Sequence, residues 1–140
     1  MSVSSICNKV FKIAIDDYHI SNSVDGKKTN PFNDSSSLEK IIYNKCWIDT
    51  VQWHFEDLIR DPKINKVEAL NLKRKIDNSN QNRTDTVEAI DEYFLNYYKN
   101  VSVKDNAKLN TESPAWAIDR LSILELKIYH MKEEKVTRGF

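Results

Sequence analysis

Two pairs of polar residues have the spacing with which helices hold divalent metal ions. His54 stands three residues before Asp57 and Glu88 stands three before Asp91, so each pair shares one face of a helix. Helical bundles bind hard cations such as Mg²⁺ or Mn²⁺ with carboxylates and histidines from facing helices. These four residues are the candidate metal ligands, and metal-dependent hydrolysis is the chemistry they would support. Solvated carboxylates and surface ion pairs produce the same spacing.

Ten consecutive polar residues, Asp77 to Thr86, form the most unusual stretch of the chain. If a helix continues through them, Asn80 and Arg83 fall on the face that is apolar at Ile76 and Val87, and burying them requires partners. One interpretation is therefore a polar pocket in which Arg83 clamps an anion. The alternatives are a structural polar network, or a break in the helix near Asn78–Arg83 with Thr84 or Asp85 capping a new helix.

A second polar interruption is Asp119-Arg120, which follows Trp116 in an otherwise apolar run. Arg120 stands four residues after Trp116, where it could stack on the indole, and an arginine so close to a core stripe pairs with an internal carboxylate or binds a ligand. With the polar stretch, this gives five ligand-binding candidates: Asn80, Arg83, Asp85, Asp119 and Arg120.

The remaining reactive side chains have simpler interpretations. His54 is either hydrogen-bonded to a carboxylate at the margin of the core or a general base or metal ligand. His19 follows two aspartates near a helix end, and His130 lies in a charged segment and is expected to be solvated. Cys7 and Cys46 lack zinc-site spacing and are predicted to be reduced core thiols.

Apolar periodicity predicts the elements that position these residues. The first helix runs from about residue 3 to 20, and the second from Ser36, as the cap of a Ser-x-x-Glu box, to Arg60 before Asp61-Pro62. A third, long or split, covers 63–98, and the last starts at Ser113-Pro114. Loops are expected at 21–35 and 99–112, and a charged, frayed tail at 132–140.

Composition limits the fold and the partners. The 140 residues include only 2 glycines and 3 prolines, which argues against all-β folds and glycine-rich nucleotide-binding loops. With 21 basic and 21 acidic residues the net charge is zero, which gives no general attraction to nucleic acid. No run of about 18 apolar residues or signal peptide is present. We therefore predict a single all-α domain over residues 1–140, a bundle of four main helices, in the cytoplasm, without membrane insertion.

Three segments carry a resemblance to a known family. Cys46–Asp57, Leu72–Asp85 and Asn110–Leu124 resemble the bacterial family called domain of unknown function 4254, and Asp16–His19 fits the same pattern. The resemblance covers about residues 5 to 135. It implies an all-helical cytoplasmic protein of the Bacteroidetes type, and it brings no reaction with it.

The last helix adds a second likeness. The segment from Ser113 to Lys127 is similar to short proteins that accompany glycosyltransferases in cell-surface polysaccharide biosynthesis. Family members run on into a further charged helical segment, so a chain that stops at Phe140 is expected to lack a helix that completes the bundle or a dimer.

Two classes of function follow. The first is a non-enzymatic accessory protein that binds a protein partner or forms a homodimer, linked to envelope polysaccharide biosynthesis. The second is a metal-dependent hydrolase or ligand-binding protein acting on a nucleotide or phosphorylated sugar, with Mg²⁺ or Mn²⁺ as its only implied cofactor. The accessory protein is favoured, because no Glu-x-x-Glu pair precedes Glu88-x-x-Asp91 and His54-x-x-Asp57 would have to take its place.

Overall fold

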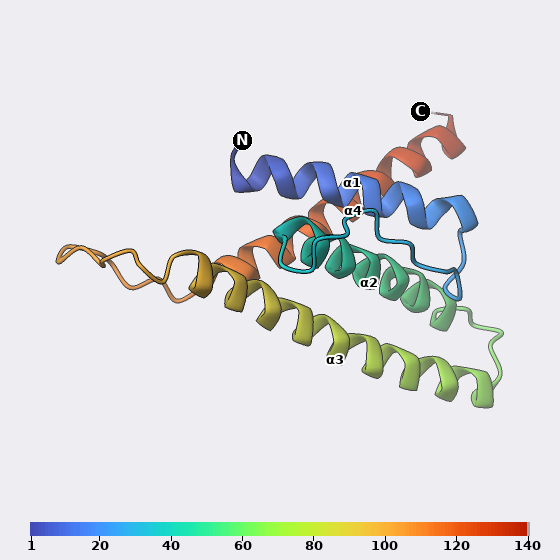
Figure 1. Ribbon diagram of the computed structural model, residues 1–140. Helices are drawn as coiled ribbons and strands as arrows, with labels where there is room; N and C mark the ends of the chain where they lie inside the picture. The colour runs from blue at the N-terminus through green and yellow to red at the C-terminus, as the bar shows by residue number, and fades with distance from the viewer. Residues whose placement is uncertain (140) are drawn as a thin grey trace.

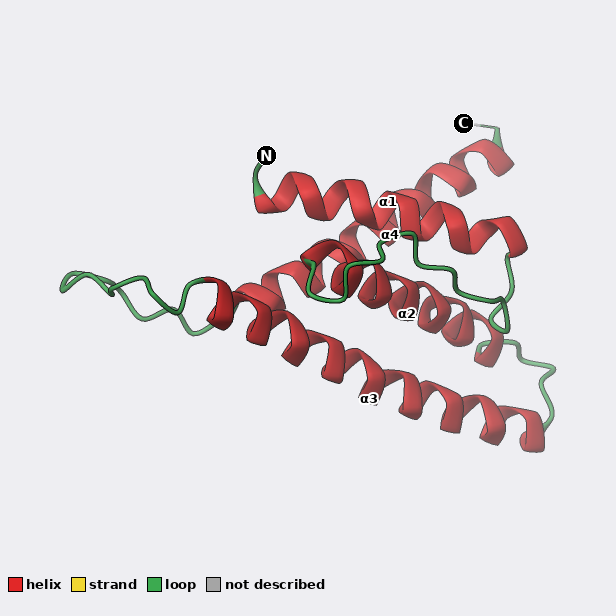
Figure 2. Cartoon of the chain, viewed as in Figure 1, coloured by secondary structure: helices red, strands yellow, loops and turns green. Residues whose placement is uncertain are grey.

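Four α-helices make up the protein (Figure 1). The structure, a computed structural model, describes residues 1–139, and no strand occurs within them (Figure 2). The helices are α1 (Val3–Ser21), α2 (Leu38–Ile59), α3 (Lys66–Tyr97) and α4 (Pro114–Arg138). The prediction of an all-α bundle of four main helices is confirmed, and of the two alternatives for the third helix, long or split, the structure shows the long one.

Polar side chains begin each helix. The side chain of the cap residue accepts a hydrogen bond from the amide of the third helical residue, which satisfies one of the free N–H groups of the first turn. Pro114 occupies the first turn of α4, as predicted. The cap of α2 is Ser37 and not Ser36, whose hydroxyl donates to Asp34 instead. The four caps are Ser2, Ser37, Asn65 and Ser113.

The polar stretch does not interrupt α3, so the interpretation of a helix break is wrong. The segment contains neither glycine nor proline. Its hydroxyls are satisfied locally, since Thr84 donates to the carbonyl of Asn80 and Thr86 to that of Arg83. Inward-facing residues find partners on other helices, so the face that is polar in the middle of α3 can be buried without loss of helical hydrogen bonds.

The end of α4 also differs from expectation, since the helix continues to Arg138 where a frayed tail was predicted. An ion pair of Arg138 with Glu134 and a hydrogen bond from Thr137 to the carbonyl of Glu133 support the last turns. Gly139, with a positive φ, caps the helix. Phe140 lies outside the described residues.

α2 is the central helix and packs against the other three. Its buried residues meet one face of α1, on which apolar side chains recur every three to four residues. The N-terminal half of α3 packs on the C-terminal half of α2 around a smaller core of Phe55, Leu72 and Ile76. No helix of residues 1–139 has the length and hydropathy needed to cross a membrane. The main core contains Cys7, Val10, Phe11, Ala14, Ile15, Tyr18, Ile42, Tyr43, Cys46, Trp47, Val87, Ile90, Ala115, Ile118 and Leu126.

Candidate functional site

A network of charged side chains lies inside the bundle where α2, α3 and α4 meet. Lys45 Nζ, which is fully buried, pairs with Asp49 on the next turn of α2 and with Asp119 Oδ1 of α4 at 2.7 Å. From α3, Arg83 donates to both oxygens of Asp119, with its Nε at 3.0 Å and its Nη2 at 2.7 Å. Ser122 donates to Asp49 Oδ2 at 2.7 Å. Arg83, which was predicted to lie on the inward face of its helix, is thus paired with Asp119, another of the predicted ligand-binding residues.

The charges of the network cancel, and most of its side chains are shielded from solvent. Two cations face two carboxylates, and the side chains of Lys45 and Asp49 are fully buried, while that of Arg83 keeps 29% exposure. Burial raises the pKa of Asp49 against the opposing effects of Lys45 and Ser122. Burial also acts on Asp119, but Arg83 and Lys45 outweigh it and hold the pKa of that carboxyl below its usual value.

The same geometry decides what the network can do. Asp119 occupies Nε and one side of Nη2 of Arg83, so the charge of the guanidinium is already paired inside the protein and only its Nη1 edge is left for another acceptor. Asp49 Oδ1 lies 3.3 Å from Arg83 Nε, yet it accepts no hydrogen bond. We interpret the network as a structural one that fixes how three helices meet, in line with the second interpretation of the polar stretch.

The other ligand candidates lie on the surface. Asn80 accepts a hydrogen bond from Gln52 at 2.7 Å, and Asp85 accepts one from Gln81 on its own helix. Arg120 is 70% exposed and pairs with Glu112 at the start of α4. The structure therefore does not bring these three residues into a pocket with Arg83 and Asp119.

A second cluster unites every histidine of the chain. His19 of α1, His54 of α2 and His130 of α4 each offer a ring nitrogen, and these nitrogens lie within 4.8 Å of one another. Helix packing has brought together residues that are separated by 35 and 76 positions in the sequence. Three imidazoles at this spacing can coordinate a transition-metal ion.

Two of the nitrogens already have the separation that such an ion requires. His54 Nε2 and His19 Nε2 share a hydrogen bond at 3.3 Å, and two nitrogens bound to one tetrahedral Zn²⁺ at about 2.0–2.1 Å lie about 3.3–3.4 Å apart, so an ion would replace the shared proton without moving the rings. His19 Nδ1 contacts the carbonyl of Ile15 at 2.7 Å. A proton on Nδ1 donates to that carbonyl and leaves Nε2 with its lone pair, which is how metal-ligating histidines are oriented.

Aromatic rings hold the imidazoles in place. His54 stacks on Tyr18, His19 stacks on Tyr129, and His130 lies flat on Trp53 with ring centroids 4.7 Å apart and planes only 7° apart. Such packing restricts the rotation of each ring before any ion arrives. The cluster is thus preorganised as a set of ring nitrogens.

His130 corrects an expectation, since a solvated residue was predicted and the side chain is half-buried. Its Nε2 is buried and has no hydrogen-bond partner. Burial and the neighbouring histidines lower the pKa of both His54 and His130, whereas Asp57 acts in the opposite direction on both. Neutral imidazoles are the form that binds metal, so this environment favours the ligating state.

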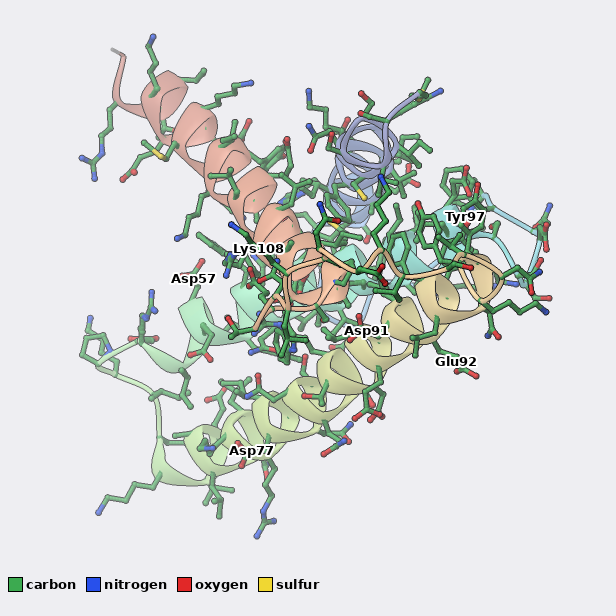
Figure 3. The ribbon with its side chains drawn as sticks, turned by 90° about the vertical axis from the view of Figure 1, so that its left-hand side faces the viewer. Asp57, Asp77, Asp91, Glu92, Tyr97 and Lys108 are labelled. Atoms are coloured by element: carbon green, nitrogen blue, oxygen red, sulfur yellow. The ribbon has the colours of Figure 1, made fainter. Side chains whose placement is uncertain are left out.

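The predicted metal ligands separate into two groups. Asp57 is exposed at the end of α2 and lines a cavity together with Glu68 and Lys75 of α3. Asp91 accepts a hydrogen bond from the amide of Ala115 at the start of α4, and it lies apart from Asp57 (Figure 3). Lys75 and Glu88 are 13 positions apart on α3, which is about 20 Å of helix. Hence Glu88 and Asp91 cannot share an ion with His54.

Sequence reasoning missed five residues of the two clusters: Lys45, Asp49, Ser122, His19 and His130. The sequence did contain a signal for Lys45 and Asp49, because they are an opposite-charge pair four residues apart within the apolar stripes of the central helix. No local signal connected the histidines, whose proximity is a property of how three helices pack.

Hollows of the described surface pass close to both clusters without including their members. Five hollows of about 360 to 550 Å³ are lined by neither a histidine nor a member of the charge network, although Asp57 and Ile118, which line two of them, adjoin the clusters.

Comparison with known proteins identifies one family. A family model described as "Protein of unknown function (DUF4254)" matches residues 39–139. Neither a curated protein nor a solved structure matches the chain. The match covers α2 except its first residue, all of α3 and α4, and two of the three histidines.

Proposed function

Because the chain belongs to the DUF4254 family, whose description carries no activity, we propose a function from the geometry: the protein binds one transition-metal ion, best matched by Zn²⁺, through His19, His54 and His130. The observation that carries this proposal is that all three histidines of the chain, each from a different helix, meet at one point. The unpartnered Nε2 of His130 supports it, since a buried polar atom without a partner is costly.

The donor set selects the class of metal. Imidazole nitrogen suits Zn²⁺ and related transition metals, whereas Mg²⁺ and Mn²⁺ prefer oxygen ligands. We therefore propose Zn²⁺ in place of the Mg²⁺ or Mn²⁺ that the sequence suggested. Three protein ligands leave a fourth position for water or an exogenous group.

We place this ion in an accessory protein and not in a hydrolase. The ion would tie the ends of α1 and α2 to the second half of α4, which is a structural role. A partner protein, the cytoplasmic location and a link with envelope polysaccharide biosynthesis remain predictions that rest on the sequence resemblance alone.

Calorimetric titration of the chelator-treated protein tests the proposal. We expect one equivalent of Zn²⁺ to bind at pH 7.5 and Mg²⁺ to give no saturable heat. At 100 times its dissociation constant a ligand of the folded state adds about 2.7 kcal/mol, so Zn²⁺ should also raise Tm by several degrees. Absence of a one-to-one Zn²⁺ isotherm, or equal binding of Mg²⁺, would contradict the proposal.

Repeating the calorimetry and the unfolding measurement at lower pH provides a second test. The unfolded histidines take up protons below about pH 6.5, whereas the pKa values of His54 and His130 in the folded chain are lower. Lowering the pH through this range should therefore reduce the stability of the metal-free protein, and Zn²⁺ binding should weaken as protons occupy the ring nitrogens. Zn²⁺ binding that stays unchanged to pH 5 would point to carboxylate ligands instead.

A further inference from the structure

An apolar groove lies at the end of the bundle where α1 begins, α3 ends and α4 begins. Two adjoining hollows, of about 390 and 550 Å³, share Phe94, Tyr98 and Pro114 as lining residues. Val3 and Leu95 complete the rim and are 38% and 74% exposed. The groove belongs to neither the histidine cluster nor the charge network, and apolar surface of this kind marks an interaction site.

The loop between α3 and α4 leaves from the rim of this groove. Residues 99–111, named here the arm, are exposed throughout and project away from the helices (Figure 1). Three of its apolar side chains are almost bare: Val101 at 64%, Val103 at 84% and Leu109 at 96% exposure. Connections between bundle helices are usually about 2–8 residues long, and longer ones tend to be functional.

The arm is basic, whereas the last turns of α3 are acidic. The arm contains three lysines, Lys99, Lys104 and Lys108, and one acidic residue, Asp105. The last turns of α3, beside the groove, contain no basic residue between positions 85 and 98. They carry four carboxylates: Asp85, Glu88, Asp91 and Glu92. Of these carboxylates Asp91 lines the groove itself, next to Lys99 at the base of the arm, so the arm's lysines match the acidic turns of α3 and its apolar side chains match the apolar lining.

We propose that a second copy of this chain is the occupant, in a two-fold homodimer in which each protomer lays its arm across the groove of its partner. The arm and the groove occur in every copy, so a two-fold axis satisfies both at once. Exchange covers Val101, Val103 and Leu109, which the protomer itself leaves in water. It also brings the arm lysines to the partner's acidic end of α3.

Sedimentation or light scattering of the full chain, in chelator so that the histidine site is not involved, tests the dimer. At about 100 µM, a dimer with a dissociation constant of about 1 µM is almost fully formed, and we expect twice the 16.4 kDa of one chain. Leu109→Asp on the arm and Leu95→Asp on the groove should each give monomers. Val67→Asp, at a residue 72% exposed near the other end of α3, is the matched control and should stay dimeric.

Mixing the two monomeric variants separates arm exchange from any other dimer. A mixed pair of Leu109→Asp and Leu95→Asp retains one intact arm on one intact groove, so partial dimerisation should return. The proposal fails if the wild-type chain is monomeric under these conditions, if the arm variant remains dimeric, or if mixing restores no dimer. Circular dichroism of each variant verifies that its helices are unchanged.

Discussion

Replacing Lys45 by methionine is expected to lower the free energy of unfolding by about 3–5 kcal/mol, the typical cost of removing one partner from a buried ion pair. The methionine retains the apolar stem of the side chain, so the loss reflects charge and not a cavity. Asp49 and Asp119 would then face each other with only Arg83, at the edge of the network, to balance them. Total stabilities of about 5–15 kcal/mol make this a large effect.

Urea denaturation followed by circular dichroism measures the change. The matched control is Lys73→Met, which breaks the exposed Lys73–Asp77 pair of the same spacing on α3. Exposed pairs contribute about 0–1 kcal/mol, so the control should lie close to the wild type. Equal stability of the two variants would contradict a structural role for the network.

Replacing His54 by glutamine is expected to weaken Zn²⁺ binding by more than about 100-fold. Loss of an outer hydrogen-bond partner of a metal ligand already costs about 10–100-fold, and removal of the ligand itself should cost more. His19→Gln and His130→Gln should have the same effect, because the three nitrogens form one set. Glutamine preserves much of the side-chain volume, so the helices should remain folded without the ion.

Calorimetry with each variant provides the measurement, and Glu88→Gln is the matched control. Glu88 belongs to the metal set that the sequence suggested, but it is exposed on α3 far from the histidines. Its substitution should leave Zn²⁺ affinity unchanged. Wild-type affinity in the His54 variant, or a loss of binding in the Glu88 variant, would move the metal away from the histidine cluster.

Most of the fold could be predicted from the sequence because its determinants are local. Apolar spacing, the cap residues and the scarcity of glycine indicate helices near their observed positions. The helix break near Asn78–Arg83, one of the alternatives for the polar stretch, shows where local reasoning fails. Polarity alone does not end a helix when partners on other helices, here Asp119 and Gln52, satisfy the side chains that face inward.

The candidate site could be predicted only in part. Arg83, Asp119 and His54 were recognised as unusual, and each does belong to a cluster. Their partners in the clusters were not recognised. Spacing along one helix identifies only neighbours three or four residues apart, whereas each cluster joins residues from three helices. His19 and His130 show the limit, since nothing in their flanking sequence indicates that they meet.

The visible absorption spectrum of the protein with one equivalent of Co²⁺ tests the central claim most directly, because Co²⁺ replaces Zn²⁺ and reports its own coordination. Three imidazoles and one further ligand should give the strong visible bands of a four-coordinate ion, saturating at one equivalent and absent in His130→Gln. Only the weak spectrum of hydrated Co²⁺, or the same spectrum in wild type and variant, would contradict a metal site built from His19, His54 and His130.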